Sequence, residues 1–363
     1  MQPGNGDRPR LRAPAGTCDT HMHVYLRQYP KAPTAKIDPP DAPVSEYLKV
    51  RERLGIERTV VVQPTTYGTD NRCTLEAMKA LGSSARGVAV VDPTVTDAEL
   101  DRLTRLGMCG IRFHMLPGGA LPWDVLETMA ARVATFGWHV QLQLDGRELP
   151  EREAQIRRLN GTLVVDHVGK FLEPVPPDSA SFRALLGLVQ NGRTWVKLSA
   201  PYEVSKRGPP NYDDVGMLAK VLVANAPERM LWATNWPHPT PGITRPNDIW
   251  MLDMLLDWVP DEATRKKVLV DNPACGHSEP GVLRDAAVSG KCCSNRRLRG
   301  AVRDLRSANP HCHPGTTRKR GGAIRRAGSP VGLPHPGKMR ASRHARVGSL
   351  VKRDVPAHPH MRI

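Results

Sequence analysis

Residues 58–63 read RTVVVQ and residues 86–92 read RGVAVVD, two short apolar runs that each end in a polar side chain. Six further runs of the same kind occur along the chain, at residues 17–24 (TCDTHMHV), 109–115 (CGIRFHM), 138–144 (WHVQLQL), 162–167 (TLVVDH), 194–199 (TWVKLS) and 230–235 (MLWATN). Runs of this length, rich in Val and Leu, are typical of buried β-strands.

Segments with the apolar spacing of amphipathic helices separate these runs, at residues 44–54, 97–106, 123–136, 181–190 and 213–224. Several of them begin at Asp or Ser, which are good N-caps. A strand followed by a helix, repeated eight times within about 260 residues, predicts an α/β fold of the (β/α)₈ TIM barrel type. A doubly wound open sheet is the alternative, which is disfavoured because no glycine-rich phosphate loop follows any early run.

The formal net charge of +16 is concentrated in the last quarter of the chain. Residues 275–363 hold 19 of the 52 basic and 4 of the 36 acidic residues, a net +15, so the rest of the chain is nearly neutral. This quarter has no Phe, Tyr or Trp and no periodic apolar pattern, so it cannot build a core. We expect a flexible segment at 1–15, a barrel at 16–274 and a disordered basic tail at 275–363.

Three interpretations of the tail are open. It binds nucleic acid non-specifically by neutralising phosphates, or it is a solvated extension without a role, or it is translated out of frame from a GC-rich gene. The third interpretation predicts that another reading frame beyond the codon for Ala274 encodes a short apolar segment. The first makes a nucleic-acid-associated protein the alternative from a different functional class.

The composition of the body favours a protein that binds a small molecule in the cytoplasm. No stretch approaches the roughly 18 apolar residues of a membrane span, and residues 1–16 lack the apolar run of a secretory signal. We therefore expect no membrane contact. The seven cysteines are an odd number, and those of the body lack C-x-x-C spacing, which favours free thiols over disulfides.

The polar residues that end the predicted strands indicate an active site, because barrels of this type build theirs at the carboxyl ends of the strands. These residues are His21, His23, Gln63, Asp92, Arg112, His114, Gln141, Gln143, Asp166, His167, Lys197, Ser199 and Asn235, with His238 close behind. The two-residue period of a strand places His21 and His23 on the same, inward face. His139 begins its strand, at the opposite end, and is expected to be structural.

Eight segments carry a family resemblance, namely the H-x-H of residues 21–23, VVVQPTTYGTDNR (60–72), RGVAVVDPTVTDAEL (86–100), GIRF (110–113), GWHVQLQ (137–143), VVDHVGK (164–170), ATNWPHP (233–239) and VDNP (270–273). With these segments in this order, residues 15–274 resemble the amidohydrolase superfamily, in the branch of 2-pyrone-4,6-dicarboxylate lactonases and D-galactarolactone isomerases. The resemblance implies a (β/α)₈ barrel that acts on lactones of small di-acids without a bound metal.

The resemblance also implies site residues, which are His21, His23, His167, Arg112 and Asn235. Asn235 departs from the lactonases, which have an aspartate that activates water, and matches the T-N-W-P-H motif of the isomerases. An amide accepts no proton at neutral pH, so hydrolysis would need His238 or His167 as the base. The chain combines features of both enzymes, because it keeps His21, which the isomerases lack.

We expect a hydrolase that opens a small carboxylated lactone by attack on the ester carbonyl, with an aldarolactone isomerase as the alternative. The predicted catalytic residues are His21, His23, His167, Asn235 and His238. The predicted substrate-binding residues are Arg112, His114, Gln63, Gln143, Lys197 and Tyr67. No cofactor is expected, and a mononuclear zinc ion held by His21, His23 and His167 is the alternative.

Overall fold

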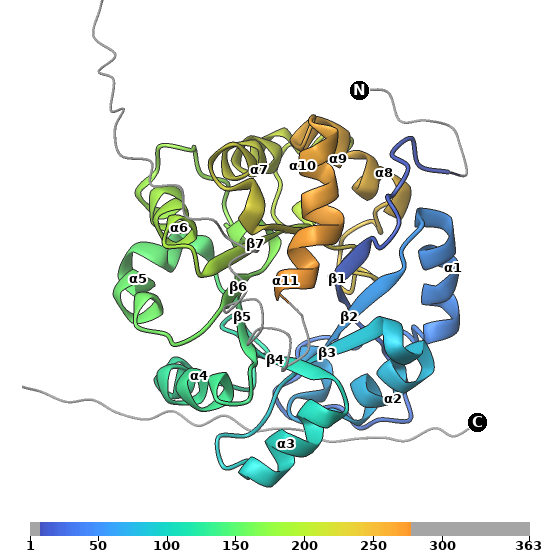
Figure 1. Cartoon of the computed structure of the whole chain (residues 1–363), viewed down its shortest axis with the longest axis vertical. Coiled ribbons are helices and arrows are strands. Elements are labelled where there is room, and N and C mark those ends of the chain that lie inside the picture. Colours follow the sequence, from blue (N-terminus) through green and yellow to red (C-terminus); the bar gives the residue numbers. More distant parts are fainter. Residues whose placement is uncertain (1–7, 277–363) are drawn as a thin grey trace, which may run out of the picture. The chain divides into compact units, whose positions relative to one another are not determined.

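The computed structural model describes residues 8–276, and within them eight parallel strands form one sheet in the order β1 to β8 (Figure 1). The strands are β1 (Cys18–Met22), β2 (Arg58–Val62), β3 (Ala85–Ala89), β4 (Met108–His114), β5 (His139–Gln143), β6 (Leu163–Val165), β7 (Thr194–Leu198) and β8 (Met230–Trp232). Each predicted strand is present, and the predicted (β/α)₈ barrel is confirmed.

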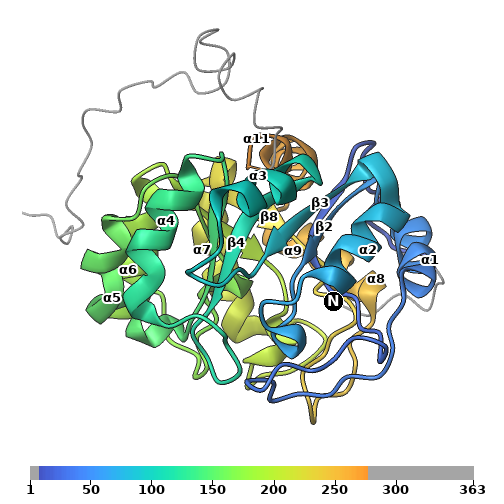
Figure 2. The same cartoon turned by 90° about the horizontal axis from the view of Figure 1, so that it is seen from below.

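Helices pack around the outer side of the sheet, and the last of them lies across one end of the barrel (Figures 1 and 2). They are α1 (Val44–Leu54), α2 (Arg72–Leu81), α3 (Asp97–Arg105), α4 (Leu126–Ala134), α5 (Leu149–Arg157), α6 (Ala180–Gln190), α7 (Asp213–Asn225), α8 (Asp248–Asp253), α9 (Leu255–Trp258), α10 (Glu262–Lys266) and α11 (Asn272–Gly276). The five predicted helical segments correspond to α1, α3, α4, α6 and α7. Three short 3₁₀ turns follow β2, β6 and β7, namely η1 (Thr65–Tyr67), η5 (His167–Gly169) and η6 (Pro201–Glu203).

Successive residues of a strand point alternately into two apolar regions, one outside the sheet and one inside the barrel. Val61 of β2 belongs to the large core between the sheet and the helices, whereas its neighbours Val60 and Val62 pack with Cys18 and Val88 inside the barrel. All of these side chains are almost fully buried. Burying an aliphatic side chain of this size contributes about 1.5–3 kcal/mol, so both regions stabilise the closed sheet.

The amino-terminal end of the barrel is covered by the last described elements. The π-helical turn η8 (Lys267–Asp271) and α11 follow one another there. Asn272 Nδ2 donates hydrogen bonds to the carbonyl oxygens of Pro227 and Met230, both at 2.8 Å, and Arg58 donates to the carbonyl oxygen of Val270 at 2.6 Å. A ligand therefore has to approach the opposite, carboxyl end of the strands.

The first described residues of the chain contact α8. Leu11 is buried and its N–H donates to Asp253 Oδ1 at 2.9 Å, while Arg10 pairs with the same carboxylate at 3.0 Å. Asp253 of α8 thus supplies an acceptor for two residues of the segment that we expected to be flexible. Residues 1–7 and the predicted basic tail beyond residue 276 lie outside the described residues. The hypothesis that the tail binds nucleic acid therefore stays a prediction.

The expectations about membrane spans and cysteines can be compared with the described residues. Among them, no helix is both long enough and apolar enough to cross a membrane. Cys18, Cys73 and Cys109 are free and buried.

β1 and β8 close the barrel through an irregular seam. Met22 pairs with Trp236 in an isolated bridge, and the His23 N–H donates to the carbonyl oxygen of Trp236 at 2.8 Å. The N–H of Asn235 donates to the carbonyl oxygen of His21 at 2.9 Å. The seam therefore runs through three of the predicted site residues and fixes their backbones relative to one another.

The carboxylate of Asp19 holds this seam together. It is fully buried, and its Oδ1 accepts hydrogen bonds from the N–H groups of His21 at 3.1 Å and Thr234 at 3.0 Å. Its Oδ2 accepts from the hydroxyls of Thr234 at 2.6 Å and Tyr47 at 2.8 Å. One side chain thus ties β1, α1 and the segment after β8 to one another.

We predict that Asp19→Ala lowers the free energy of unfolding by about 3–5 kcal/mol, because it removes the acceptor of the buried N–H groups of His21 and Thr234. Urea unfolding followed by far-UV circular dichroism measures this loss. Asp97→Ala removes an exposed carboxylate that pairs with Arg132 and serves as the control, with an expected loss below about 1 kcal/mol. Equal unfolding midpoints for the two variants would contradict the role of Asp19.

Candidate active site

A β-bulge in β1 directs two imidazoles into the barrel. The pairing of β1 with β2 shifts its register between Asp19 and Met22. Cys18 packs inside the barrel, whereas Met22, four residues later, belongs to the outer core, so strict alternation is broken between them. His21 and His23, on either side of Met22, consequently face inward.

The two imidazoles of β1 contact each other. His21 Nε2 lies 3.1 Å from His23 Nε2. His23 Nδ1 lies 2.7 Å from the carbonyl oxygen of Val62, which can only accept, so this nitrogen carries the proton and Nε2 is an acceptor. Burial, reinforced by the charge of Arg112, lowers the pKa of His23 to about 3. The ring is therefore neutral at neutral pH.

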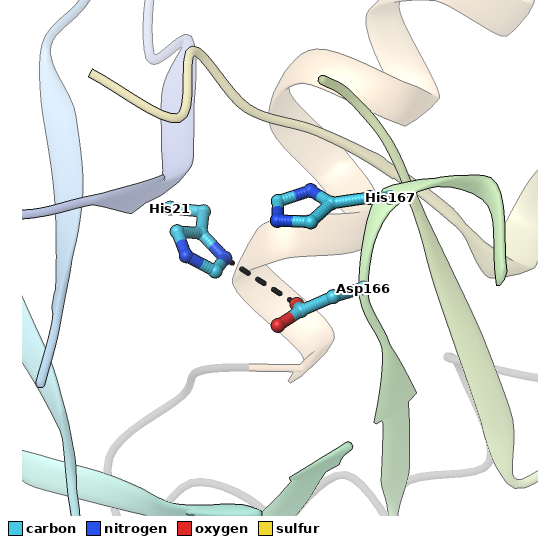
Figure 3. A group of neighbouring side chains, drawn as sticks. All are labelled: His21, Asp166 and His167. Atoms are coloured by element: carbon cyan, nitrogen blue, oxygen red, sulfur yellow. Dashed lines mark ion pairs between the residues drawn. The ribbon is translucent and has the colours of Figure 1, made fainter. Parts of the chain in front are cut away.

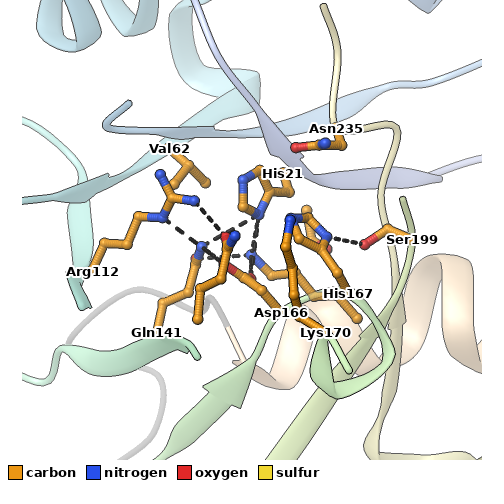
Figure 4. A network of polar contacts seen from close by, with 12 residues as sticks. His21, Val62, Arg112, Gln141, Asp166, His167, Lys170, Ser199 and Asn235 are labelled. Carbon is orange, nitrogen blue, oxygen red and sulfur yellow. Dashed lines mark hydrogen bonds and ion pairs between the residues drawn. The ribbon is translucent and has the colours of Figure 1, made fainter. Parts of the chain in front are cut away.

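A buried carboxylate and a buried ammonium lie beside His21. Asp166 Oδ1 is 3.3 Å from His21 Nδ1 (Figure 3) and 3.3 Å from Lys197 Nζ. Lys197 Nζ also lies 3.1 Å from His21 Nδ1 and donates to Gln141 Oε1 at 2.8 Å. Gln141 Nε2 donates to Asp166 Oδ2 at 3.0 Å (Figure 4). Burial by itself raises the pKa of Asp166, but Lys197 and His21 outweigh it and hold that pKa well below its ordinary value.

His167 follows β6 on a strained turn. Its φ is 55° and that of Val168 is 56°, in the left-handed region that a β-branched residue rarely adopts. His167 Nδ1 lies 2.8 Å from Ser199 Oγ, whereas Nε2 makes no hydrogen bond to any of residues 8–276 (Figure 4). Burial lowers the pKa of His167 to about 4, so this ring is also neutral and its Nε2 can contact a ligand.

A cavity of about 290 Å³ lies at the carboxyl ends of the strands. Its polar lining includes the imidazoles His23, His114 and His167, the amides Gln143 and Asn235, the cations Lys36, Arg112 and Lys170, and the carboxylate Glu203. Arg112 is held by hydrogen bonds to the carbonyl oxygen of Gln63 at 3.1 Å and to Gln143 Oε1 at 2.8 Å. Three cations and one carboxylate favour an anionic ligand.

Asn235 leaves its amide oxygen available for a ligand. Its Nδ2 donates to the hydroxyl oxygen of Tyr202 at 2.8 Å and to Glu203 Oε1 at 3.3 Å. Because a carboxylate only accepts, Glu203 determines which end of the amide is the nitrogen. Oδ1 makes no hydrogen bond within the described part of the chain, so it can accept one from a water molecule or a substrate hydroxyl.

Tyr202 connects Asn235 to His238. The tyrosine hydroxyl lies 2.9 Å from His238 Nδ1, and His238 Nε2 lies 2.8 Å from Asp248 Oδ1. In the neutral ring the proton lies on Nε2, toward Asp248, and Nδ1 accepts from Tyr202. Both nitrogens are engaged, and His238 lines a neighbouring cavity of about 510 Å³, so it reaches the site through Tyr202.

Glu203 forms an ion pair with Lys170 in the cavity wall. Burial by itself raises the pKa of Glu203, but Lys170 and His167 outweigh it and lower that pKa to about 2. Thr240 Oγ1 also donates to Glu203 Oε1 at 2.5 Å. Both oxygens of this carboxylate are engaged, by Lys170, Thr240 and Asn235, so Glu203 serves to orient Asn235.

The structure brings most of the predicted site residues to this cavity. The residues that line it are His23, His167, Asn235, Arg112, His114 and Gln143. His21 lies behind His23 and is fully buried. His114 Nδ1 is buried without a hydrogen bond among the described residues, which leaves it to a ligand.

Three predicted substrate-binding residues do not line the cavity. Gln63 uses its amide within the loop after β2, where Nε2 donates to the carbonyl oxygens of Gly68 and Asp70. The hydroxyl of Tyr67 exchanges hydrogen bonds with the backbone of Leu26. Lys197 is fully buried beside His21 and does not reach the cavity.

Lys36, Lys170 and Glu203 line the cavity although the strand-end pattern does not include them. Lys170 ends the segment 164–170, which resembles the family, and this is the signal that could have found it, whereas Glu203 lies in η6 after β7. Lys36 comes from the loop between β1 and α1, where no pattern marks it.

The donor atoms of His21, Asp166 and His167 lie within 4.8 Å of one another, close enough to suggest a metal site. Asp166 Oδ1 has no hydrogen bond within the described residues, but it already faces the ammonium of Lys197. A divalent ion here would stand beside that ammonium, with a repulsion of several kcal/mol even at an effective dielectric constant of about 20. The residues present therefore do not fit a divalent metal.

The barrel, its H-x-H strand and the polar cluster at the carboxyl ends define an enzyme of the amidohydrolase class. A family model described as amidohydrolase matches residues 18–274, so the chain belongs to the amidohydrolase family.

Two relatives and one solved structure are similar over most of their length. The chain is 36% identical over 273 residues to the D-galactarolactone isomerase of Agrobacterium fabrum, covering 74% of this chain and 93% of that one. It is 36% identical over 281 residues to the 2-pyrone-4,6-dicarboxylate hydrolase of Comamonas testosteroni, covering 74% and 92%. An apo crystal structure from Agrobacterium tumefaciens matches with a TM-score of 0.70 at 35% identity, covering 74% and 98%.

We predict that the imidazoles of His23, His114 and His167 stay neutral well below the ordinary histidine pKa of about 6.5, because burial favours the uncharged form. His167 protonates near pH 4 and the other two near pH 3. Since unfolding restores the ordinary pKa, the stability that these rings contribute is present above about pH 6.5 and is lost as the pH falls toward 4.

Ring-nitrogen NMR of ¹⁵N-histidine-labelled protein measures this titration, with His→Gln variants for assignment and the urea-unfolded chain as the reference. A midpoint near pH 6.5 for His167 in the folded protein would contradict the prediction.

Proposed function

We propose that the protein opens a small carboxylated lactone by adding water to the ring ester. The observation that carries this proposal is the cavity itself, in which the cations Arg112 and Lys36 face neutral imidazoles and the free amide oxygen of Asn235. Lactones of small di-acids bring carboxylates for the cations and a carbonyl for the nucleophile. The names of the two relatives, a lactone isomerase and a pyrone dicarboxylate hydrolase, support this substrate class.

Arg112 is the residue best placed to recognise negative charge. Its guanidinium is buried and fixed by Gln63 and Gln143, so it is oriented before the ligand arrives. A guanidinium can bind a substrate carboxylate, and it can equally stabilise the oxyanion that forms when the carbonyl is attacked. Lys36 and Lys170 add positive charge to the same cavity.

His167 and Asn235 act on the nucleophile. Asn235 Oδ1 accepts a hydrogen bond from a water molecule, and His167 Nε2 removes a proton from it as the new C–O bond forms. The carbonyl electron pair moves to the oxygen, beside Arg112. When the tetrahedral intermediate collapses, the ring C–O bond breaks, and the departing oxygen takes the proton back from His167.

Lactone isomerisation is the second candidate, and Asn235 favours it. The amide orients an O–H group but removes no proton, so it can hold a substrate hydroxyl in the place of water. A hydroxyl of the same molecule attacks at a high effective concentration, which compensates for a weak base. His167 would transfer the proton in the same way in both reactions.

We predict turnover of at least one member of a panel of pyrone dicarboxylates and aldarolactones, unchanged by a chelator. Ring opening is followed by absorbance and ring migration by NMR. His167→Ala should abolish either reaction. Asn235→Asp should raise hydrolysis relative to isomerisation by about 10-fold, because the neighbouring charge of Glu203 raises the pKa of the introduced carboxyl and improves it as a base. No turnover of any lactone, or full activity of His167→Ala, would overturn the proposal.

We also predict that Tyr202→Phe lowers kcat about 10-fold with little change in KM. Without the hydroxyl, Asn235 loses one of the two acceptors that orient its amide, so the nucleophile is held less well while substrate binding is preserved. Tyr212→Phe is the control, since its hydroxyl makes no hydrogen bond within the described residues and does not line the cavity. Equal kcat values for the two variants would argue against this role.

A further inference from the structure

Lys197 is a buried lysine that the proposed reaction does not use directly. Its Nζ contacts Gln141 Oε1 at 2.8 Å, His21 Nδ1 at 3.1 Å and Asp166 Oδ1 at 3.3 Å. An ammonium has hydrogens to donate and no lone pair to accept with. Each of these three atoms must therefore offer the ammonium of Lys197 a lone pair or a negative charge.

The contact with His21 decides where that ring carries its proton. Two donors, Lys197 Nζ at 3.1 Å and Gln141 Nε2 at 3.3 Å, face Nδ1 and outweigh the single acceptor Asp166 Oδ1 at 3.3 Å, so the neutral ring has its hydrogen on Nε2, 3.1 Å from His23 Nε2. His23 Nε2 is an acceptor, since its Nδ1 donates to the carbonyl oxygen of Val62. The contacts Lys197–His21, His21–His23 and His23–Val62 then each pair one donor with one acceptor. The opposite tautomer of His21 would set two lone pairs against each other at 3.1 Å.

This arrangement is the reverse of the one that a metal requires. A metal-binding histidine turns a lone pair toward the ion and donates its other N–H to a carboxylate or carbonyl group. His23 makes such a contact with Val62. His21 Nδ1 also lies 3.3 Å from a carboxylate oxygen, Asp166 Oδ1, but it has no hydrogen to donate there, because its lone pair is turned toward Lys197 and the hydrogen is on Nε2.

The charges in the barrel lead to the same conclusion. Asp166 is compensated by Lys197 at 3.3 Å and faces Arg112 Nε at 3.9 Å. If Lys197 were uncharged, the carboxylate would lose its nearest cation, and His21 would be free to take the other tautomer. The donor atoms of His21, Asp166 and His167 would then present the negative charge and the lone pairs that a divalent ion prefers.

We propose that the ammonium of Lys197 takes the place of a metal ion inside this barrel. It holds His21 in the Nε2–H form, and it excludes a divalent metal from the cluster of His21, Asp166 and His167. Lys197 is thus a positioning residue that acts through His21 on His23 and the floor of the cavity. The inference goes beyond the proposed function, since it holds whichever lactone is turned over.

The test is Co²⁺ binding to the full-length protein, followed by visible absorption and by metal analysis after dialysis. Lys197→Met keeps the length of the side chain and removes its charge, and we expect it to bind one additional Co²⁺ per chain about 100-fold more tightly than the unsubstituted protein does. Lys220→Met is the control, because Lys220 is an exposed lysine that pairs with Asp257 and does not contact the cluster, and its Co²⁺ affinity should not change.

The double variant Lys197→Met with His167→Gln locates the ion, because the gain should disappear when one ligand is removed. Any metal bound elsewhere on the chain is common to all four proteins and cancels in the comparison. Tight Co²⁺ binding at this cluster in the unsubstituted protein, or no gain in a folded Lys197→Met variant, would overturn the proposal.

Ring-nitrogen NMR of the unsubstituted protein gives an independent result that does not require the variant to fold. His21, assigned by His21→Gln, should show a protonated Nε2 and an unprotonated Nδ1 at pH 7. In Lys197→Met this ring should change to the Nδ1–H form. A protonated Nδ1 in the unsubstituted protein would refute the inference, whatever the metal measurements show.

Discussion

The closure of the barrel between β1 and the segment after β8 is the constraint on which the rest of the structure depends. β8 is only three residues long, so the seam relies on Asp19, which accepts hydrogen bonds from both sides of it. The backbone of Asn235 is bonded to that of His21 in the same seam. The contact that completes the fold therefore also sets the positions of the imidazoles and the amide.

The interior of the barrel carries charge, which sets the character of the cavity above it. Asp166 lies close to two cations, Lys197 and Arg112, and burying these groups is tolerable only because they are paired. The surrounding imidazoles remain neutral because the same burial penalises their protonated forms. The result is a small cavity whose positive charge comes from Arg and Lys, and whose histidines are free to exchange protons with a ligand.

Much of the fold and part of the site could be predicted from local pattern. The apolar runs and helical spacings marked all eight strands, and strand ends marked His23, His167, Arg112 and Asn235, because side chains at the carboxyl ends must converge when the sheet closes. Gln63 and Tyr67 also lie close to a strand end, yet their polar groups donate hydrogen bonds to carbonyl oxygens of loop residues. Lys36 reaches the cavity from a loop whose path no periodicity describes.

What the sequence by itself determined is the order of strands and helices, the family, and the set of residues at one rim, since these depend on composition and spacing along the chain. Only the tertiary structure decided where each polar side chain of the site points and which of its atoms carries a hydrogen. The bulge in β1 reverses the alternation that starts at Cys18, and Lys197 turns from an expected ligand contact into the partner of His21 and Asp166. These outcomes depend on contacts between residues far apart in the chain, for which spacing along the sequence carries no information.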